Sequence, residues 1–167
     1  MYQIGSSVVY ASHGVCKIVT TEKRRVDKKN VEYLVLEPVD KASCRYYVPL
    51  NNEMAMAKLR PLLTQADLDS LLDPDSLRAD VWVEDEDLRK VKYKDLISGN
   101  DISALISMIH YLHIHKDRQL EAGRKFHQCD ENFLRDAQKL LETEFSLVLG
   151  LPESEVADHI RRLFICP

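Results

Sequence analysis

The residue with the most distinctive chemistry in this sequence is its only tryptophan, Trp82, which lies next to a run of charges. Acidic residues occupy positions 84–87, and a basic cluster from Arg89 to Lys94 follows them. An exposed ring beside such cations could insert at a DNA base step while the cations neutralise flanking phosphates. Alternatively, the indole packs in a core or between domains, as tryptophan commonly does. The residues alone leave both interpretations open.

A second basic cluster lies at the end of an expected strand, where Arg24 and Arg25 are followed by Lys28 and Lys29. Clustered surface cations keep a protein soluble without taking part in any specific contact. Taken alone, this pattern favours a solubilising hairpin tip over a binding surface.

Patterns typical of catalytic sites are absent from the sequence. It contains no GxxxxGK[ST] phosphate loop, no GxGxxG motif and no GxSxG nucleophile elbow, and it has only five glycines. The consecutive carboxylates at 84–87 are typical of a helix start, where they complement the helix dipole. We therefore expect no catalytic residue and no cofactor. An uncharacterised small enzyme remains an alternative, because catalytic residues can be distant in sequence.

Candidate metal ligands are also scarce. His110 and His113 could share one face of a helix, but no third ligand follows at a matching turn. The cysteines show neither a CxxC pair nor a zinc-module spacing. They are Cys16, Cys44, Cys129 and Cys166. The sequence therefore predicts no metal site and four reduced thiols.

Composition and charge describe a globular chain with two unlike halves. Hydrophobic residues make up 45% and charged residues 30% of the 167 positions. No apolar run approaches the roughly 20 residues of a membrane span, and no secretory signal is visible, so we expect a cytoplasmic protein without membrane contact. Residues 1–60 hold ten Lys/Arg and six Asp/Glu, a net charge of +4, whereas the remainder holds 13 and 21, a net charge of −8. This asymmetry suggests two modules with different partners, and it limits any DNA contact in the second half to a local one.

The elements that must position these residues differ between the halves as well. The first sixty residues predict short strands at 8–10, 15–26, 31–36 and 44–48. A turn at His13-Gly14 and a polar hairpin connection at 27–30 join three of them. Short strands joined by short turns predict a small barrel or a strongly bent sheet.

From residue 64 the hydrophobic period becomes helical. Helices are expected at 64–72, at 84–97, from 102 onward, at 120–127, at 130–149 and at 152–162. The 64–67 segment resembles a capping box with Asp in place of Glu, and the 84–97 helix is expected to bury Leu88, Val91 and Leu96. We therefore expect an α+β protein, with a small N-terminal β-barrel or bent sheet at residues 1–62 and a compact all-α bundle at residues 63–167.

Several short motifs, taken in order and spacing, resemble the CarD/CdnL family of bacterial transcription regulators over nearly the whole chain. The segment Ile4–Tyr10 with His13–Val15 resembles the opening of that family, and Glu32–Leu36 continues the pattern. The other matching motifs are Val48-Pro49, Arg60, Trp82, Ser98–Asn100, Leu120–Lys125 and Ala137–Glu144.

This resemblance implies a non-catalytic regulator with two binding surfaces. A Tudor-like N-terminal domain would dock on the β subunit of RNA polymerase, partly by strand pairing. The helical domain would touch promoter DNA at the upstream edge of the melted region, where the family's tryptophan wedges in the minor groove and slows collapse of the bubble. The implied polymerase contacts are Arg24, Arg25, Val26 and Tyr47. The implied DNA contacts are Trp82, Arg89, Lys90, Lys92, Arg124 and Lys125.

The sequence departs from the family at two of these places. Tyr47 stands where the family has a second arginine, and four acidic residues follow Trp82 where members often have arginines. We expect a monomer whose DNA binding is weak alone and becomes sufficient when polymerase tethers it. The alternative is a passive polymerase-docking module without DNA contact, like the related domain of the transcription-repair coupling factor.

Overall fold

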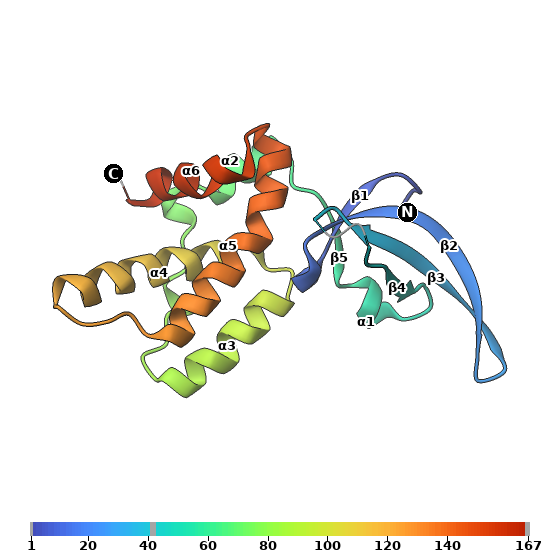
Figure 1. Cartoon of the computed structure of the whole chain (residues 1–167), viewed down its shortest axis with the longest axis horizontal. Coiled ribbons are helices and arrows are strands. Elements are labelled where there is room, and N and C mark those ends of the chain that lie inside the picture. The colour runs from blue at the N-terminus through green and yellow to red at the C-terminus, as the bar shows by residue number, and fades with distance from the viewer. Residues whose placement is uncertain (1, 41–42, 166–167) are drawn as a thin grey trace. The chain divides into compact units, whose positions relative to one another are not determined.

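The computed structural model describes residues 2–40 and 43–165 and has the predicted α+β fold. The chain divides into two compact units, Met1–Leu62 and Leu63–Pro167, and each is described by itself. The first unit is a five-stranded antiparallel sheet with the strand order β4-β3-β2-β1-β5. Its strands are β1 (Ser7–Tyr10), β2 (Val15–Val26), β3 (Lys29–Pro38), β4 (Tyr46–Pro49) and β5 (Leu59–Pro61) (Figure 1).

The sheet curls around a small apolar core. Side chains from all five strands bury themselves there, and each is no more than 5% exposed. They are Val8, Cys16, Ile18, Leu34, Leu36, Val48 and Leu59. Strand β5 and the one-turn helix α1 (Glu53–Met56) were not predicted from the sequence. Asn52 caps the N-terminus of α1, and its side-chain oxygen accepts a hydrogen bond from the Ala55 N–H. Both elements are too short to produce a periodic pattern.

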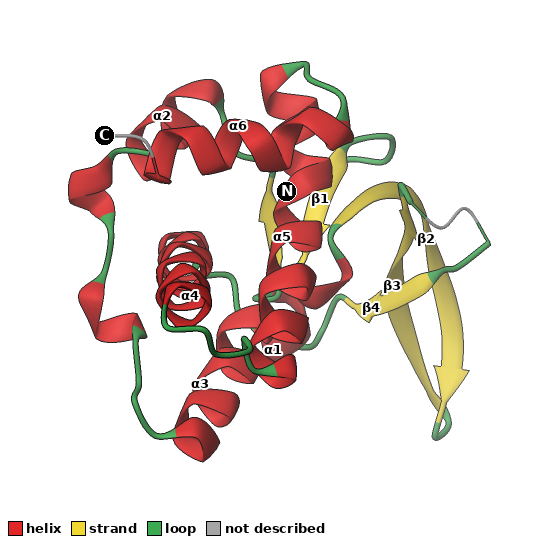
Figure 2. Cartoon of the chain, turned by 60° about the vertical axis from the view of Figure 1, so that its left-hand side comes forward, coloured by secondary structure: helices red, strands yellow, loops and turns green. Residues whose placement is uncertain are grey.

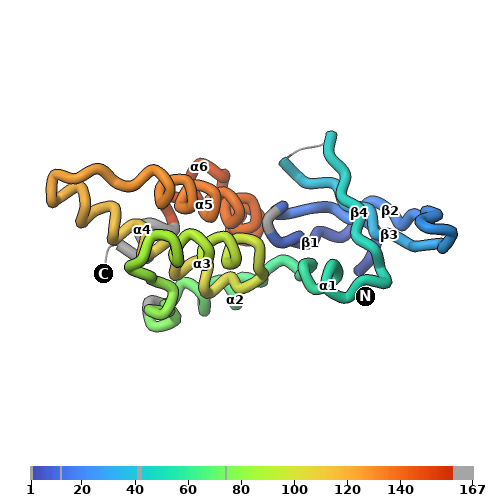
Figure 3. Tube along the Cα trace, turned by 90° about the horizontal axis from the view of Figure 1, so that it is seen from below, coloured from blue at the N-terminus to red at the C-terminus, as the bar shows by residue number. Residues whose placement is uncertain are grey.

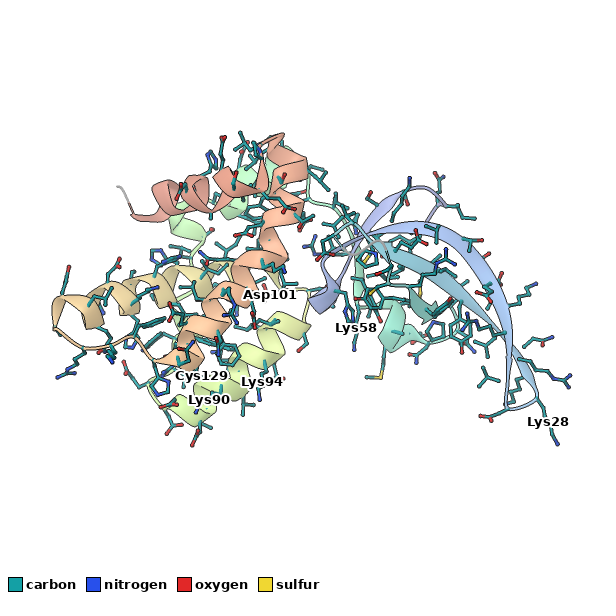
Figure 4. The ribbon with its side chains drawn as sticks, viewed as in Figure 1. Lys28, Lys58, Lys90, Lys94, Asp101 and Cys129 are labelled. Atoms are coloured by element: carbon teal, nitrogen blue, oxygen red, sulfur yellow. The ribbon has the colours of Figure 1, made fainter. Side chains whose placement is uncertain are left out.

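A long hairpin dominates this unit. The β2 and β3 strands pair over most of their length and turn through two residues, Asp27 and Lys28, which both have positive φ. Two consecutive left-handed residues form the tight turn whose twist suits a hairpin. From Thr20 to the tip every β2 residue is exposed, so the outer hairpin is a solvated ribbon (Figure 2). Lys28 marks its far end (Figure 4).

The second unit is a helical bundle. Its helices are α2 (Gln65–Leu71), α3 (Glu86–Ser98), α4 (Ile102–Glu121), α5 (Gln128–Leu149) and α6 (Glu153–Ile165). One-turn 3₁₀ segments at Pro74–Ser76 and Ala79–Val81 lead from α2 toward α3. Helix α5 packs against both α4 and α6 (Figure 3). The fully buried centre of the bundle includes Tyr93, Met108, Leu112 and Phe145.

Local chemistry marks several helix ends. Thr64 and Asp67 form the capping box that the sequence predicted, and Asp101 caps α4 by accepting from the Ala104 N–H. Gly150 ends α5 in the left-handed conformation, with φ of 65°. Among the described helices, none is both long and apolar enough to cross a membrane.

Two helix predictions were wrong. The short helix expected at 120–127 does not form, because α4 runs on to Glu121 and a loop then leads to α5. Helix α3 also presents a different face to the bundle. Leu88 and Val91 are 64% and 61% exposed, whereas Arg89 and Tyr93 are buried.

The burial of Cys16 generates the first prediction. Desolvation, together with the nearby Asp40 charge, raises the pKa of the Cys16 thiol to about 11. A thiol with a raised pKa holds almost no thiolate at pH 8, and thiolate is the form that alkylating reagents attack. Cys44 is exposed. Iodoacetamide at pH 8 should therefore modify Cys44 while Cys16 stays unmodified until the protein is unfolded, as peptide mass analysis would show. Equal labelling of both in the folded protein would contradict the buried position of Cys16.

Candidate functional site

The register of β2, β3 and β4 places three of the four predicted polymerase-contact residues on one face of the sheet. Directly paired residues point to the same side, and the register pairs Arg24 with Val31 and Val35 with Tyr47. The Arg24 guanidinium carbon lies 3.7 Å from the Tyr47 ring centroid. Alternation along β2 places Val26 on the face of Arg24 and Arg25 on the opposite face.

The Arg24 side chain is held in place although it is exposed. Its Nε and one terminal nitrogen donate to the two carboxylate oxygens of Glu22, both at 3.2 Å. This hydrogen bonding raises the pKa of Arg24, so the group stays charged. Tyr33 supports the Tyr47 ring edge-on at 6.5 Å. The tyrosine therefore gives Arg24 an aromatic platform.

One edge of β2, the edge that faces away from β3 and β4, lacks a strand partner over its outer part among the described residues. Strand β1 pairs with β2 only between Val15 and Lys17, and the Gly5 and Ser6 backbones then bond to Ile18. Within residues 2–40 and 43–165, no strand pairs with the outer edge of β2 beyond that point. An open strand edge can accept a strand from another chain.

Trp82 lies at the end of the 3₁₀ turn that precedes α3, with its side chain partly exposed. Its indole N–H donates to the Glu84 carboxylate at 2.9 Å. The ring contacts His115 of α4 at 4.7 Å between centroids, and the Arg89 guanidinium carbon lies 5.0 Å from the indole. Trp82 is thus a partly exposed ring that also packs against the apolar core of the bundle.

Arg89 holds the segment that carries this ring. Its guanidinium makes a two-point ion pair with Asp130 at 3.1 and 2.8 Å, and both side chains are almost fully buried. A further nitrogen donates to the carbonyl oxygens of Val83 and Glu84, at 2.8 and 3.0 Å. A guanidinium engaged in this way cannot reach a phosphate without breaking the pair. We therefore remove Arg89 from the predicted DNA contacts and assign it a positioning role.

The other predicted DNA contacts fall into two groups. Lys90 pairs with Glu86 at 2.6 Å and with Asp87 at 3.3 Å, and Lys92 donates to the Asp80 carbonyl. The acidic residues in the first turn of α3 thus pair with Lys90, and a backbone carbonyl before the helix binds Lys92. Lys90 and Lys94 both project from α3 (Figure 4). Local pairing leaves Lys90 and Lys92 poorly suited to a phosphate contact.

Arg124 and Lys125 lie differently, in the loop between α4 and α5, and both are exposed. The next residue, Phe126, contacts His115 at 6.1 Å between ring centroids. Because His115 also contacts Trp82, the aromatic row links this basic loop to the indole. The loop that carries Arg124 and Lys125 therefore adjoins this aromatic row through Phe126.

A cavity of about 280 Å³ opens beside the indole. Tyr111, His115 and Arg118 line it from α4, and Ala79 and Glu84 line it from the chain around Trp82. The sequence analysis missed these α4 residues, although their i, i+4 and i+7 spacing was a usable signal for one helix face. Burial lowers the pKa of His115. Among the described residues, no group of three His, Cys, Asp or Glu side chains is arranged to hold a metal ion.

Comparison with known protein families identifies the first unit. Residues 2–61, a little more than a third of the chain, match the family model described as the CarD-like/TRCF RID domain. This confirms the resemblance for the N-terminal unit, and it supports a transcription-related role that involves RNA polymerase. A domain of this kind is a protein-interaction domain and not a catalytic one. A search of the curated proteins found no match to the chain.

The buried ion pair generates the second prediction. Arg89→Met should lower the free energy of unfolding by about 3–5 kcal/mol, because it leaves the Asp130 carboxylate buried without its partner. Urea unfolding measures this loss, and the emission of the only tryptophan should shift as the 83–84 segment loosens. Arg135→Met is the matched control, since the Arg135–Asp136 pair is exposed and at 3.4 Å. Equal stability of the two variants would mean that the pair does not hold the segment.

Proposed function

Because residues 2–61 form a CarD-like/TRCF RID domain, we propose that this protein docks on the β subunit of RNA polymerase and stabilises the promoter open complex. The domain match is the observation that carries the proposal. The proposed docking surface is the β2–β3 ribbon, with the stack of Arg24 on Tyr47 on its face and the open edge of β2 along its side. The protein would act as a cytoplasmic monomer without catalytic activity.

The proposed DNA contact is the surface around Trp82. The partly exposed indole would wedge in the minor groove at the upstream edge of the melted region. Arg124 and Lys125, which are exposed near the aromatic row, would contact the flanking phosphates. Two cations in a unit of net charge −8 provide little affinity for free DNA. Docking on polymerase would raise the local concentration to roughly the millimolar range, at which such contacts suffice.

A passive docking module is the second candidate. The local pairing of Lys90 and Lys92 and the burial of Arg89 favour it, because they remove three cations from the predicted DNA surface. The two candidates share the polymerase contact and differ only in whether Trp82 acts at the promoter. The variants below test each contact by itself.

Arg24→Glu should weaken binding to the β subunit by about tenfold or more, because it removes the charge that stacks on Tyr47 and places two acids side by side. Calorimetry measures the affinity, and circular dichroism checks that the sheet stays folded. Lys58→Glu makes the same charge change at another exposed position of the unit. If Arg24→Glu and Lys58→Glu bind equally well, the docking surface lies elsewhere.

Trp82→Ala should remove most of the gain in open-complex lifetime. That gain is roughly tenfold if the wild-type protein stabilises the open complex by about 1.4 kcal/mol. The cost of this substitution in folding stability should fall below the about 3–5 kcal/mol typical of a buried tryptophan, since the ring is partly exposed. Leu88→Ala, on the exposed face of α3, is the control. Unchanged lifetimes with Trp82→Ala, together with normal polymerase binding, would favour the passive module.

A further inference from the structure

We propose that the cavity beside Trp82 receives one unpaired nucleobase from the melted promoter strand. This inference rests on the proposed function and deepens it, because it names the group that the Trp82 surface would recognise. A simple wedge needs only an exposed ring. The structure has a concave site of about 280 Å³ next to that ring, and three observations indicate what it would hold.

Three of the seven residues that line the cavity carry flat rings. Trp82 and Tyr111 contribute rings, and His115 contributes an imidazole that lies 4.7 Å from the indole. Burial lowers the pKa of His115, which favours the neutral ring near pH 7. Planar uncharged rings are the surfaces on which proteins stack single bases without regard to sequence. Ile114 and Ala79 complete the apolar lining.

The charges of the cavity favour a neutral polar ligand over an anion. Glu84 and Arg118 both line it, and their charges are opposite. A site built for a free phosphate would not include a carboxylate. The Glu84 carboxylate accepts from the indole N–H at 2.9 Å and keeps acceptor capacity for a base amino or imino group. Arg118 can donate to base carbonyls or to the attached phosphate.

The size of the cavity suits a single ring system. Sites for drug-sized ligands begin at about 300 Å³, so this one lies at the lower limit and is far too small for a base pair. Extruding a base costs least where the strand is already unpaired. The upstream edge of the bubble supplies such bases within reach of a tethered protein. Exposed Arg124 and Lys125, next to Phe126 in the aromatic row, could hold the adjoining backbone.

The test uses open complexes of polymerase with the whole chain. Each unpaired base at the upstream edge of the bubble is replaced in turn by an abasic site, and the gain in open-complex lifetime is measured on every template. At one position, the gain in open-complex lifetime on the abasic template should be at least about fivefold smaller than on the intact template, as expected for the loss of one base–aromatic stack. The other positions should keep it.

A cavity-filling variant tests whether the cavity itself is needed for the gain. Ala79→Leu adds a side chain inside the site and leaves the indole in place, whereas Ala66→Leu adds the same bulk on the exposed surface of α2. Ala79→Leu should reduce the gain on the intact template and make it insensitive to the abasic position. Ala66→Leu should behave as wild type on all templates.

The outcomes separate this inference from the function on which it rests. Equal gains on all abasic templates, or a normal gain with Ala79→Leu, would overturn the base site. If Trp82→Ala still removes the gain in that case, the wedge stands without a base site. If wild-type protein gives no gain on the intact template, both the inference and the proposed stabilisation of the open complex are wrong.

Discussion

The buried ion pair between Arg89 and Asp130 is the interaction on which the Trp82 surface depends. Burying two charges is costly, and here the cost is offset by two-point geometry and by two further hydrogen bonds to backbone carbonyls. Those carbonyls belong to Val83 and Glu84, the residues that follow the indole. One guanidinium therefore joins α3, α5 and the chain around Trp82. The pair converts a segment with little regular structure into a fixed support for an aromatic ring.

The same pair explains why the face of α3 could not be predicted. Hydrophobic periodicity assigns apolar residues to the interior, so it placed Leu88 and Val91 inward. The structure buries Arg89 and Tyr93 instead, and Tyr93 packs edge-on against Phe133 at 5.7 Å between ring centroids. A buried polar residue is visible in a sequence only if its distant partner is known. Where no such pair intervenes, as in the Thr64 capping box or at Gly150, local chemistry was sufficient.

In the candidate sites too, the sequence indicated which residues to consider but not which residues they contact. Sequence reasoning singled out Trp82 because it is the only tryptophan and lies beside a run of charges, whereas Arg24 and Tyr47 were implied by the resemblance to the CarD/CdnL family. It could not find the stack of Arg24 on Tyr47, because that contact depends on the register of three strands. Nor could it see that Lys90 is satisfied by the carboxylates one turn earlier. Charges counted along a chain overstate the cations that remain available on the surface.

These constraints together favour a division of labour between the two units. A helical unit of net charge −8 repels a polyanion over most of its surface, so any DNA contact there has to be short-ranged and confined to a few groups. A rigidly supported ring beside a cavity is suited to that task, because stacking acts at contact distance and is little affected by net charge. If the protein acts as proposed, long-range attraction would not serve it, because charge attraction does not distinguish melted from duplex DNA. On the proposed function, polymerase docking supplies the encounter, and the Trp82 surface supplies the discrimination.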